Sequence, residues 1–179
     1  MIRIGLAQGD VQRAAKFFNA KPAQIKRATR RTVRTITNDL HKELGGTIPR
    51  EADISVLGYR KVRVKKKTPK GRGKSSTGSV WVGQNQVQAR FAKGRKRNDK
   101  ARGGAWAGKY FFKNAFVLKA KSGFESIFQR TGKGKLPVKQ AYINLPKAQE
   151  FTRKAADRAK NRLVPLLEKN LRIEMNKRK

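Results

Sequence analysis

The chain has 179 residues, with 46 Lys and Arg against 11 Asp and Glu, and carries a formal net charge of +35. It has no cysteine, which excludes disulfide frameworks and cysteine-based zinc sites, and no apolar run long enough to predict a membrane-spanning helix. Although only 37% of the residues are hydrophobic, the length predicts one domain over residues 1–179 with a buried core.

The N-terminal part of the chain predicts two helices. Val11 to Phe18 forms the first, a short one. From Pro22 to Leu44 one set of residues recurs at steps of three and four, as in a long amphipathic helix with a single buried stripe. This stripe consists of Ile25, Thr29, Val33, Ile36, Leu40 and Leu44. The pair Gly45-Gly46 predicts that the helix ends directly after the stripe.

Between residues 62 and 144 the apolar residues change from helical to alternating spacing, which predicts a small antiparallel β-sheet of about four to five strands. The candidate segments for these four to five strands are Val62–Val64, Val80–Val82, Val87–Phe91, Phe111–Leu118, Phe124–Arg130 and Val138–Asn144. Gly83-Gln84-Asn85 predicts a hairpin of the second and third of these. Ser122-Gly123 is short enough to make the fourth and fifth antiparallel neighbours.

Two segments rich in Lys, Arg and Gly interrupt these strands, residues 65–78 and 93–104. They contain almost nothing to bury, so we expect long, flexible basic loops that become ordered on binding a partner. Residues 54–124 hold twenty cations and one acid, Asp99, an imbalance that favours an anionic partner. The cations expected to contact DNA or an acidic partner are Lys65, Lys66, Lys67, Lys70, Arg72, Arg95, Lys96, Arg97 and Lys100.

From Pro146 to Asn176 the apolar residues return to helical spacing and predict a C-terminal helix. Pro165 has no backbone N–H to donate, so we expect a kink or break near Arg162. Residues 176–179 form a short basic tail. The elements together predict an α+β fold: a long N-terminal helix, a small antiparallel sheet with long basic loops, and a C-terminal helix kinked near Pro165.

The residue types that catalysis needs are scarce. The only histidine, His41, lies in the last turns of the first long helix, where an interaction with the helix dipole is a simpler interpretation than a general base. Asp39 and Glu43 share a face of that helix, and Glu51 and Asp53 follow, but a solvated helix end explains them more simply than a metal site. We therefore expect no enzymatic activity, no metal and no cofactor.

Several aromatic residues lie close to the basic segments: Trp81, Trp106, Tyr110, Phe111 and Phe112. With the neighbouring cations they are able to stack on unpaired bases, but aromatic side chains at alternating strand positions more often belong to the core. The chain has no pattern of a recognition helix, an RNP motif or a zinc finger. We therefore expect the basic segments to bind phosphate groups or a protein surface without reading a base sequence.

The segment from Gly108 to Asn144 combines an apolar strand, a Gly-containing turn, and the sequences Ile127–Gly132 and Lys135–Val138. An Arg-Thr-rich stretch at residues 30–35 precedes it, and a helix closes the chain. This combination resembles the minor tail protein Z family of long-tailed phages and, more distantly, the head–tail joining and tail-completion proteins. The positions that carry the resemblance are Arg130, Gly132, Leu136 and Pro137, and it implies a structural role for them.

The resemblance implies a structural virion protein, assembled in the host cytoplasm, at the head-proximal end of the tail. There a ring, hexameric as the resemblance implies, would complete the tail and join the tail terminator to the head connector. The basic residues would contact double-stranded DNA in the lumen, without sequence specificity, or acidic surfaces of these neighbours. The turn from Arg130 to Val138 would position the last strand and make an inter-subunit contact.

Two other interpretations remain open at this point. A ribosomal-type RNA-binding protein would share the charge and the Gly/Lys-rich loops, which such proteins insert into folded RNA. A metal-dependent nuclease would need several of the acids to converge on one cleft. Neither interpretation, nor the resemblance, calls for a membrane partner.

Overall fold

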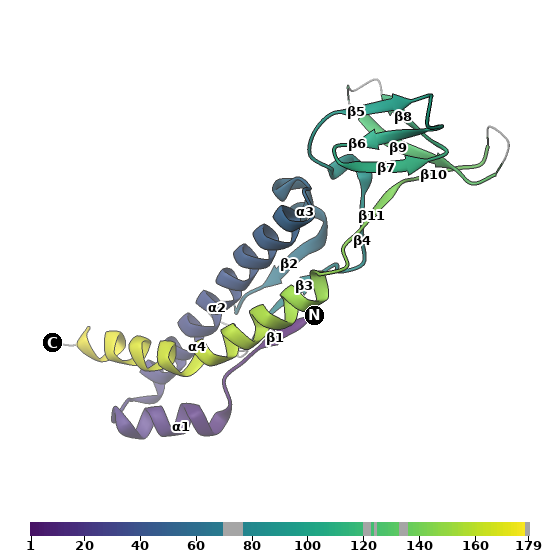
Figure 1. The fold of residues 1–179 in the computed structure, drawn as a ribbon. Helices are drawn as coiled ribbons and strands as arrows, with labels where there is room; N and C mark the ends of the chain where they lie inside the picture. The colour runs from purple at the N-terminus through teal and green to yellow at the C-terminus, as the bar shows by residue number, and fades with distance from the viewer. Residues whose placement is uncertain (70–76, 120–122, 124, 133–135, 178–179) are drawn as a thin grey trace. The chain divides into compact units, whose positions relative to one another are not determined.

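The computed structural model describes residues 1–69, 77–119, 123, 125–132 and 136–177 (Figure 1). These residues form four α-helices and several small antiparallel sheets, which confirms the α+β fold class predicted from the sequence. The expectation of one sheet of about four to five strands is wrong, because the described strands are divided among three three-stranded sheets and one two-stranded pair. The chain divides into two compact units. The first contains Met1–Gly45, Val64–Val82 and Gln149–Lys179, and the second contains Gly46–Arg63 and Gly83–Ala148. The length led us to expect a single domain, and the contacts of the chain gather in these two units.

The first unit is built on the packing of helix α4 (Ala148–Asn176) against α2 (Pro22–Glu51). The Asn170 amide donates a buried hydrogen bond of 2.9 Å to the Thr32 hydroxyl, and Arg162 pairs with Asp39 at 2.9 Å, so the two helices run antiparallel. Members of the predicted stripe that are almost completely buried are Val33, Ile36, Leu40 and Leu44. Helix α1 (Gln8–Phe17) joins a buried cluster of Ala14, Ala28, Leu167 and Leu171.

Helix α2 does not end at Gly45-Gly46 but continues to Glu51. A helical glycine costs only about 1 kcal/mol relative to alanine, and Ile48, one turn further on, extends the apolar stripe and is buried. The helix stops where Asp53 adopts a left-handed φ of 47° and its N–H bonds to the Arg50 carbonyl oxygen. The glycine pair was therefore the wrong stop signal.

The sheet of the first unit is antiparallel, with the strand order β1 (Ile2–Ile4), β3 (Gly78–Val82), β2 (Val64–Lys67). Two predictions for this region are wrong. Val62 belongs to helix α3 (Val56–Arg63) rather than to a strand, and β3 pairs with β1 and β2 rather than with residues 87–91. In the central place β3 has backbone hydrogen-bond partners on both sides, and its Val80 side chain is fully buried.

The second unit contains two three-stranded antiparallel sheets and a pair of strands. One sheet has β5 (Lys96–Asp99), β6 (Gly104–Ala107) and β7 (Tyr110–Lys113), and the other has β8 (Ala115–Lys119), β9 (Glu125–Arg130) and β10 (Val138–Gln140). Strand β4 (Gln86–Gln88), followed by the 3-10 turn η1 (Ala89–Phe91), pairs with β11 (Tyr142–Asn144). Helix α3 contributes the fully buried Tyr59, whose hydroxyl donates to the Gly83 carbonyl oxygen at 3.0 Å.

The predicted antiparallel pairing of residues 111–118 with residues 124–130 is confirmed by the β8–β9 ladder. The expected strand 111–118 is nevertheless two strands. Asn114, with a left-handed φ of 54°, separates β7 from β8 and lets them join different sheets. The expected strand 138–144 is likewise divided at Ala141, between β10 and β11. A single apolar run therefore supplies strands to two sheets.

The two segments predicted to be long basic loops contain strands. Lys65, Lys66 and Lys67 belong to β2, and residues 93–104 include β5 and its turn into β6. Residues 70–76 of the first segment lie outside the described residues. The loop prediction for residues 93–104 failed because β5 has no apolar face of its own. Its order comes from backbone pairing with β6, from Lys96 opposite Ala107 to Asp99 opposite Gly104.

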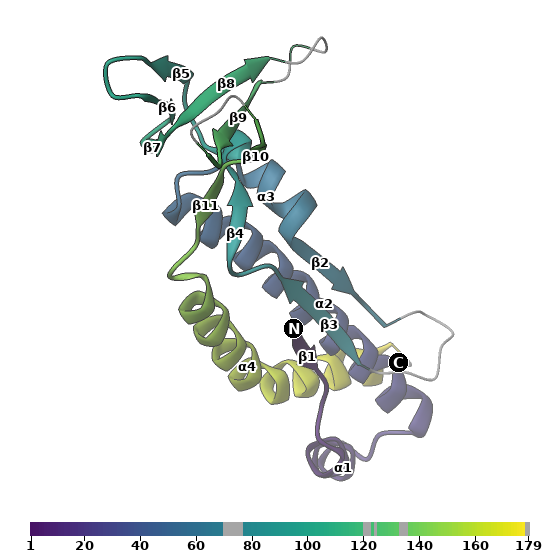
Figure 2. The ribbon, with the colours of Figure 1, turned by 90° about the vertical axis from the view of Figure 1, so that its right-hand side faces the viewer.

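Helix α4 confirms the predicted C-terminal helix, with its first turn beginning at Ala148 rather than Pro146. Pro165 lies inside the helix without breaking it, and Figures 1 and 2 show the helix changing direction along its length, as a proline kink would produce. Residues 178 and 179 of the expected basic tail lie outside the described residues. Among the helices that the structure describes, none is long and apolar enough to cross a membrane.

Candidate nucleic-acid interface

The predicted cationic contacts fall on strands in different units. Those of the first unit are Lys65, Lys66 and Lys67 on β2, and those of the second are Arg95, Lys96, Arg97 and Lys100 on or beside β5. Lys70 and Arg72 lie outside the described residues. The described cations thus form two basic surfaces, one in each unit, which we name the β2 surface and the β5 surface.

On the β2 surface, lysine side chains lie beside an exposed tryptophan. Lys65 is opposite Trp81 in the ladder, and its Nζ lies 6.0 Å from the indole centroid. Lys67 shares the face of Lys65, because alternate residues of a strand point the same way. Lys66 points to α2 and donates to Asn38 Oδ1 at 2.6 Å. Lys65 and Lys67 are therefore the lysines of this surface that point away from α2.

On the β5 surface, one row of side chains crosses the whole sheet. Arg97 of β5 is opposite Trp106 of β6, which is opposite Phe111 of β7, so the three share one face. Phe111 is 36% exposed, whereas Ala105 and Ala107 on the other face are fully buried. The interpretation of the strand aromatics as core residues is therefore wrong for Phe111. We name the outward side the Trp106 face; it consists of Arg97, Arg102, Trp106, Phe111 and Lys113.

Asp99 holds the Trp106 ring in place. Its Oδ2 accepts the indole N–H at 3.0 Å, and its Oδ1 accepts the Arg102 backbone N–H at 3.1 Å. The hydrogen bond from Trp106 and then that from Arg102 keep the pKa of Asp99 below its ordinary value. The Arg102 guanidinium lies 5.7 Å from the indole centroid, and the Phe111 ring lies 5.0 Å from it at an angle of 50°. Asp99, the single acid of residues 54–124, therefore fixes the position of the Trp106 ring.

Gly104 gives Phe111 its position on the sheet. A Cβ atom at Gly104 would overlap the Phe112 carbonyl oxygen and come within 2.7 Å of the Phe111 ring. The ring therefore lies over bare backbone, and its inner side is packed while its outer side stays exposed.

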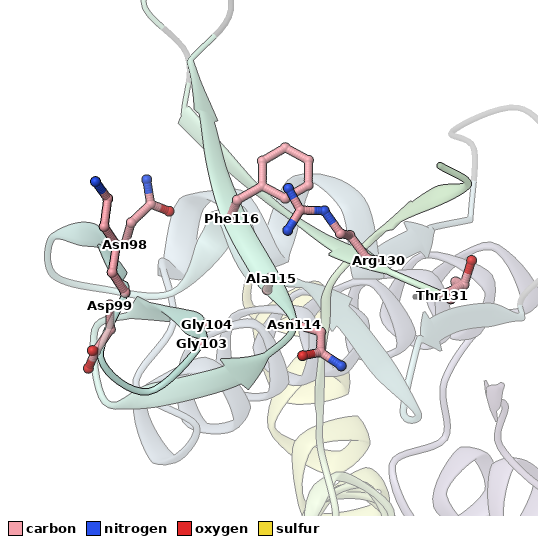
Figure 3. Close-up of a pocket in the computed structure, with 11 residues that line it drawn as sticks. Asn98, Asp99, Gly103, Gly104, Asn114, Ala115, Phe116, Arg130 and Thr131 are labelled. Atoms are coloured by element: carbon pink, nitrogen blue, oxygen red, sulfur yellow. The ribbon is translucent and has the colours of Figure 1, made fainter. Parts of the chain in front are cut away.

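A pocket of about 840 Å³ lies in the second unit, between the β5–β6 turn and the end of β9 (Figure 3). On the β9 side the Arg130 guanidinium lies 5.1 Å from the centroid of the Phe116 ring, and Figure 3 shows the two side chains together. On the opposite side Asp99 and Lys100 line the pocket. Its charged groups, among the described residues, are therefore two cations and a carboxylate that is already bonded to Trp106.

The residues that carry the family resemblance lie at the end of β9 and directly before β10. Gly132 lines the pocket together with Arg130. Thr131, between them, donates from its N–H at 3.2 Å and from its hydroxyl at 3.0 Å to the Pro137 carbonyl oxygen. Leu136 is exposed. The inter-subunit contact that the resemblance implies for these residues stays a prediction.

Two of the four acids considered as metal ligands form ion pairs between helices. Asp39 pairs with Arg162 of α4 at 2.9 Å, and Glu43 pairs with Arg158. Both carboxylates stay partly exposed, as expected of solvated side chains, but α2 continues past them to Glu51, so they do not lie at the helix end. Within the described residues, no group of three His, Cys, Asp or Glu side chains is placed to hold a metal ion. Because α2 continues past it, His41 lies inside the helix rather than in its last turns.

A buried carboxylate that the sequence did not reveal lies near the end of α4. Glu174 is only 3% exposed and accepts from Arg27 at 2.7 Å and Lys177 at 3.0 Å, with Arg31 at 3.2 Å. The hydrogen bond from Lys177, opposed in part by burial and aided by Arg27, lowers the pKa of Glu174 below its ordinary value. Part of the positive charge of α2 is thus neutralised inside the first unit.

Glu174→Gln is expected to lower the free energy of unfolding by about 1–2 kcal/mol at pH 7, the modest value reflecting the half-exposed partner cations. Because the folded pKa is lowered, the ionised carboxylate stabilises fully above the ordinary Glu pKa of about 4.3, and this contribution disappears as pH falls through the lowered value. Urea denaturation at pH 7 and pH 3 measures both effects.

The matched control is Glu51→Gln, which breaks the exposed pair of Glu51 with Lys147 at 3.3 Å. It should cost no more than about 0.5 kcal/mol. If Glu174→Gln were as mild as this control at pH 7, the cluster around Glu174 would not stabilise the fold.

Comparison with protein-family models, curated proteins and solved structures finds no match for this chain. The geometry by itself describes an α+β protein whose ordered strands expose cations and aromatic rings side by side.

Proposed function

We propose that this protein is a structural virion subunit that completes the tail of a long-tailed phage at its head-proximal end and joins the tail terminator to the head connector. One observation carries the proposal. Within the described residues, Lys65, Lys67, Arg95 and Arg97 are exposed on or beside ordered strands and form no ion pair with an acid. Such surfaces favour neutralisation by an anionic neighbour.

The setting of that neighbour comes from the resemblance of residues 108–144 to the minor tail protein Z family. In a virion tail the anionic neighbours are double-stranded DNA in the lumen and acidic faces of the adjoining proteins. Cations on a strand contact phosphate groups without reading bases, and such binding weakens steeply with salt. A homo-oligomeric ring, hexameric by the same resemblance, would repeat both basic surfaces around the lumen. The role has no catalytic step.

Particles assembled without this subunit are expected to yield DNA-filled heads and finished tails that fail to join, because each half forms independently of the joint. Electron micrographs of the particles give the joined fraction, and the titre of infectious particles should fall with it. Purified subunit added to the separate heads and tails should restore joining. Normal joining in its absence would contradict the proposal.

A further inference from the structure

The Trp106 face carries aromatic rings that the core does not use. The other side of the same sheet is closed by the fully buried Ala105 and Ala107. Phe111 lies over Gly104 with its outer side exposed, and Trp106 is fixed beside it by Asp99. A contiguous apolar patch with a polar rim marks a binding surface, and here the adjoining, partly exposed rings of Trp106 and Phe111 lie among cations. A surface that only contacted phosphate groups would not need the rings.

We propose that the Trp106 face binds single-stranded DNA by stacking unpaired bases on Trp106 and Phe111. The two ring centroids lie 5.0 Å apart at an angle of 50°, so the rings pack against each other as one bent platform, and bases would stack on its outer side rather than between the rings. Stacking on an aromatic ring accepts any base, because every base has a π-face. The platform therefore suits DNA of any sequence.

Cations at the edges of the platform fit the phosphate backbone. Arg97 neighbours Trp106 in the row across the strands, and Lys113 shares the face of Phe111 on β7, so a positive side chain flanks each ring. Arg102 lies over the indole ring, 5.7 Å from its centroid, so a base that stacks on this side of Trp106 would displace the guanidinium toward a phosphate group. The carboxylate on this face is already engaged by the indole N–H, which limits its repulsion of a polyanion.

Unpaired DNA is the ligand that uses both features of the face. In a duplex the base faces are covered by their neighbours in the stack, so only phosphate groups reach the cations. An acidic protein surface would meet the cations, but it would use the rings only if it also placed apolar side chains against them. The choice of DNA over RNA rests on the proposed function, since the packaged genome is the nucleic acid in a phage tail.

The test uses the full-length protein with labelled oligo(dT), a DNA duplex of the same length, and oligo(rU). Phe111→Ala removes a ring without removing a hydrogen bond, and it should weaken oligo(dT) binding about 5- to 100-fold while changing duplex binding less than about twofold. Trp106→Ala should act alike, and Trp106→Phe, which keeps a ring, should retain most of the affinity. Tyr142→Ala is the matched control, because Tyr142 is 42% exposed in the same unit but on β11, and it should change none of the affinities.

Unchanged oligo(dT) binding by both alanine variants would overturn the inference. Equal losses on oligo(dT) and duplex would also overturn it, because the face would then contact phosphate groups alone. Tighter binding of oligo(rU) than of oligo(dT) through the same two residues would overturn the choice of DNA. The proposed function is tested by a separate assay, the joining of heads and tails. Normal joining without the subunit would contradict that function, but it would not change the measured difference between oligo(dT) binding and duplex binding.

Discussion

The variant K65Q/K67Q/R95Q/R97Q is expected to bind double-stranded DNA about a thousand-fold more weakly than the wild type at 0.1 M salt. All four side chains are exposed on or beside strands of the two basic surfaces. Each contact with a phosphate group adds about 0.9 to the slope of log affinity against log salt, so losing four lowers the slope by about 3.6. At 0.1 M salt this corresponds to about three orders of magnitude in affinity. Fluorescence anisotropy of a labelled duplex over a salt series measures both quantities.

The control removes the same net charge from exposed helix positions. K16Q/K26Q/K160Q/K169Q neutralises four lysines of α1, α2 and α4 and leaves both basic surfaces intact. It should weaken duplex binding by less than about tenfold, because these side chains act only through the screened field of the whole molecule. Equal losses in the two variants would show that net charge, rather than these strands, binds DNA, and would contradict the assignment of the surfaces.

The helices could be predicted from the sequence because their signal is long and periodic. The stripe from Val33 to Leu44 is buried as expected, and α4 begins and ends close to its predicted bounds. The stop of α2 could not be predicted from Gly45-Gly46, because the burial of Ile48 outweighs the small propensity cost of helical glycine. Strand β5 could not be predicted either, since Lys96–Asp99 is polar and its order depends on pairing with a strand that follows it in the chain.

The cations of the candidate site were evident from the sequence, but their organisation was not. That Arg97 and Trp106 are cross-strand neighbours depends on the register of β5 and β6, which composition does not specify. A weak signal was present, because small residues alternate with Trp106 as Ala105 and Ala107 and mark one side of the strand for close packing. The partners of Glu174 left a trace too, since Arg27 and Arg31 are one helical turn apart.

Gly108→Ala is expected to destabilise the second unit by about 3 kcal/mol and to displace the Trp106 face. Gly108 begins the two-residue turn between β6 and β7 with a left-handed φ of 57°. A Cβ atom there would overlap the carbonyl oxygen of Lys93, a backbone atom that no side-chain rotation can move away. Lys93 is itself held, because its N–H donates to the Asp53 carbonyl oxygen at 3.1 Å. The strained φ and the overlap therefore both lower the free energy of unfolding, and each such constraint contributes about 1–3 kcal/mol.

Gly103→Ala separates these two contributions. Gly103 lies in the other turn of the same sheet with a φ of 62°, but a Cβ atom there would meet nothing within 4 Å. Gly103→Ala should therefore lower the free energy of unfolding only through the left-handed backbone conformation, by about 1 kcal/mol. Urea denaturation in a Trp81→Phe background, where Trp106 is the remaining tryptophan, follows the sheet directly. Equal destabilisation by the two alanines would mean that the close approach of Gly108 to Lys93 does not shape this sheet, and the platform of Trp106 and Phe111 would then need another support.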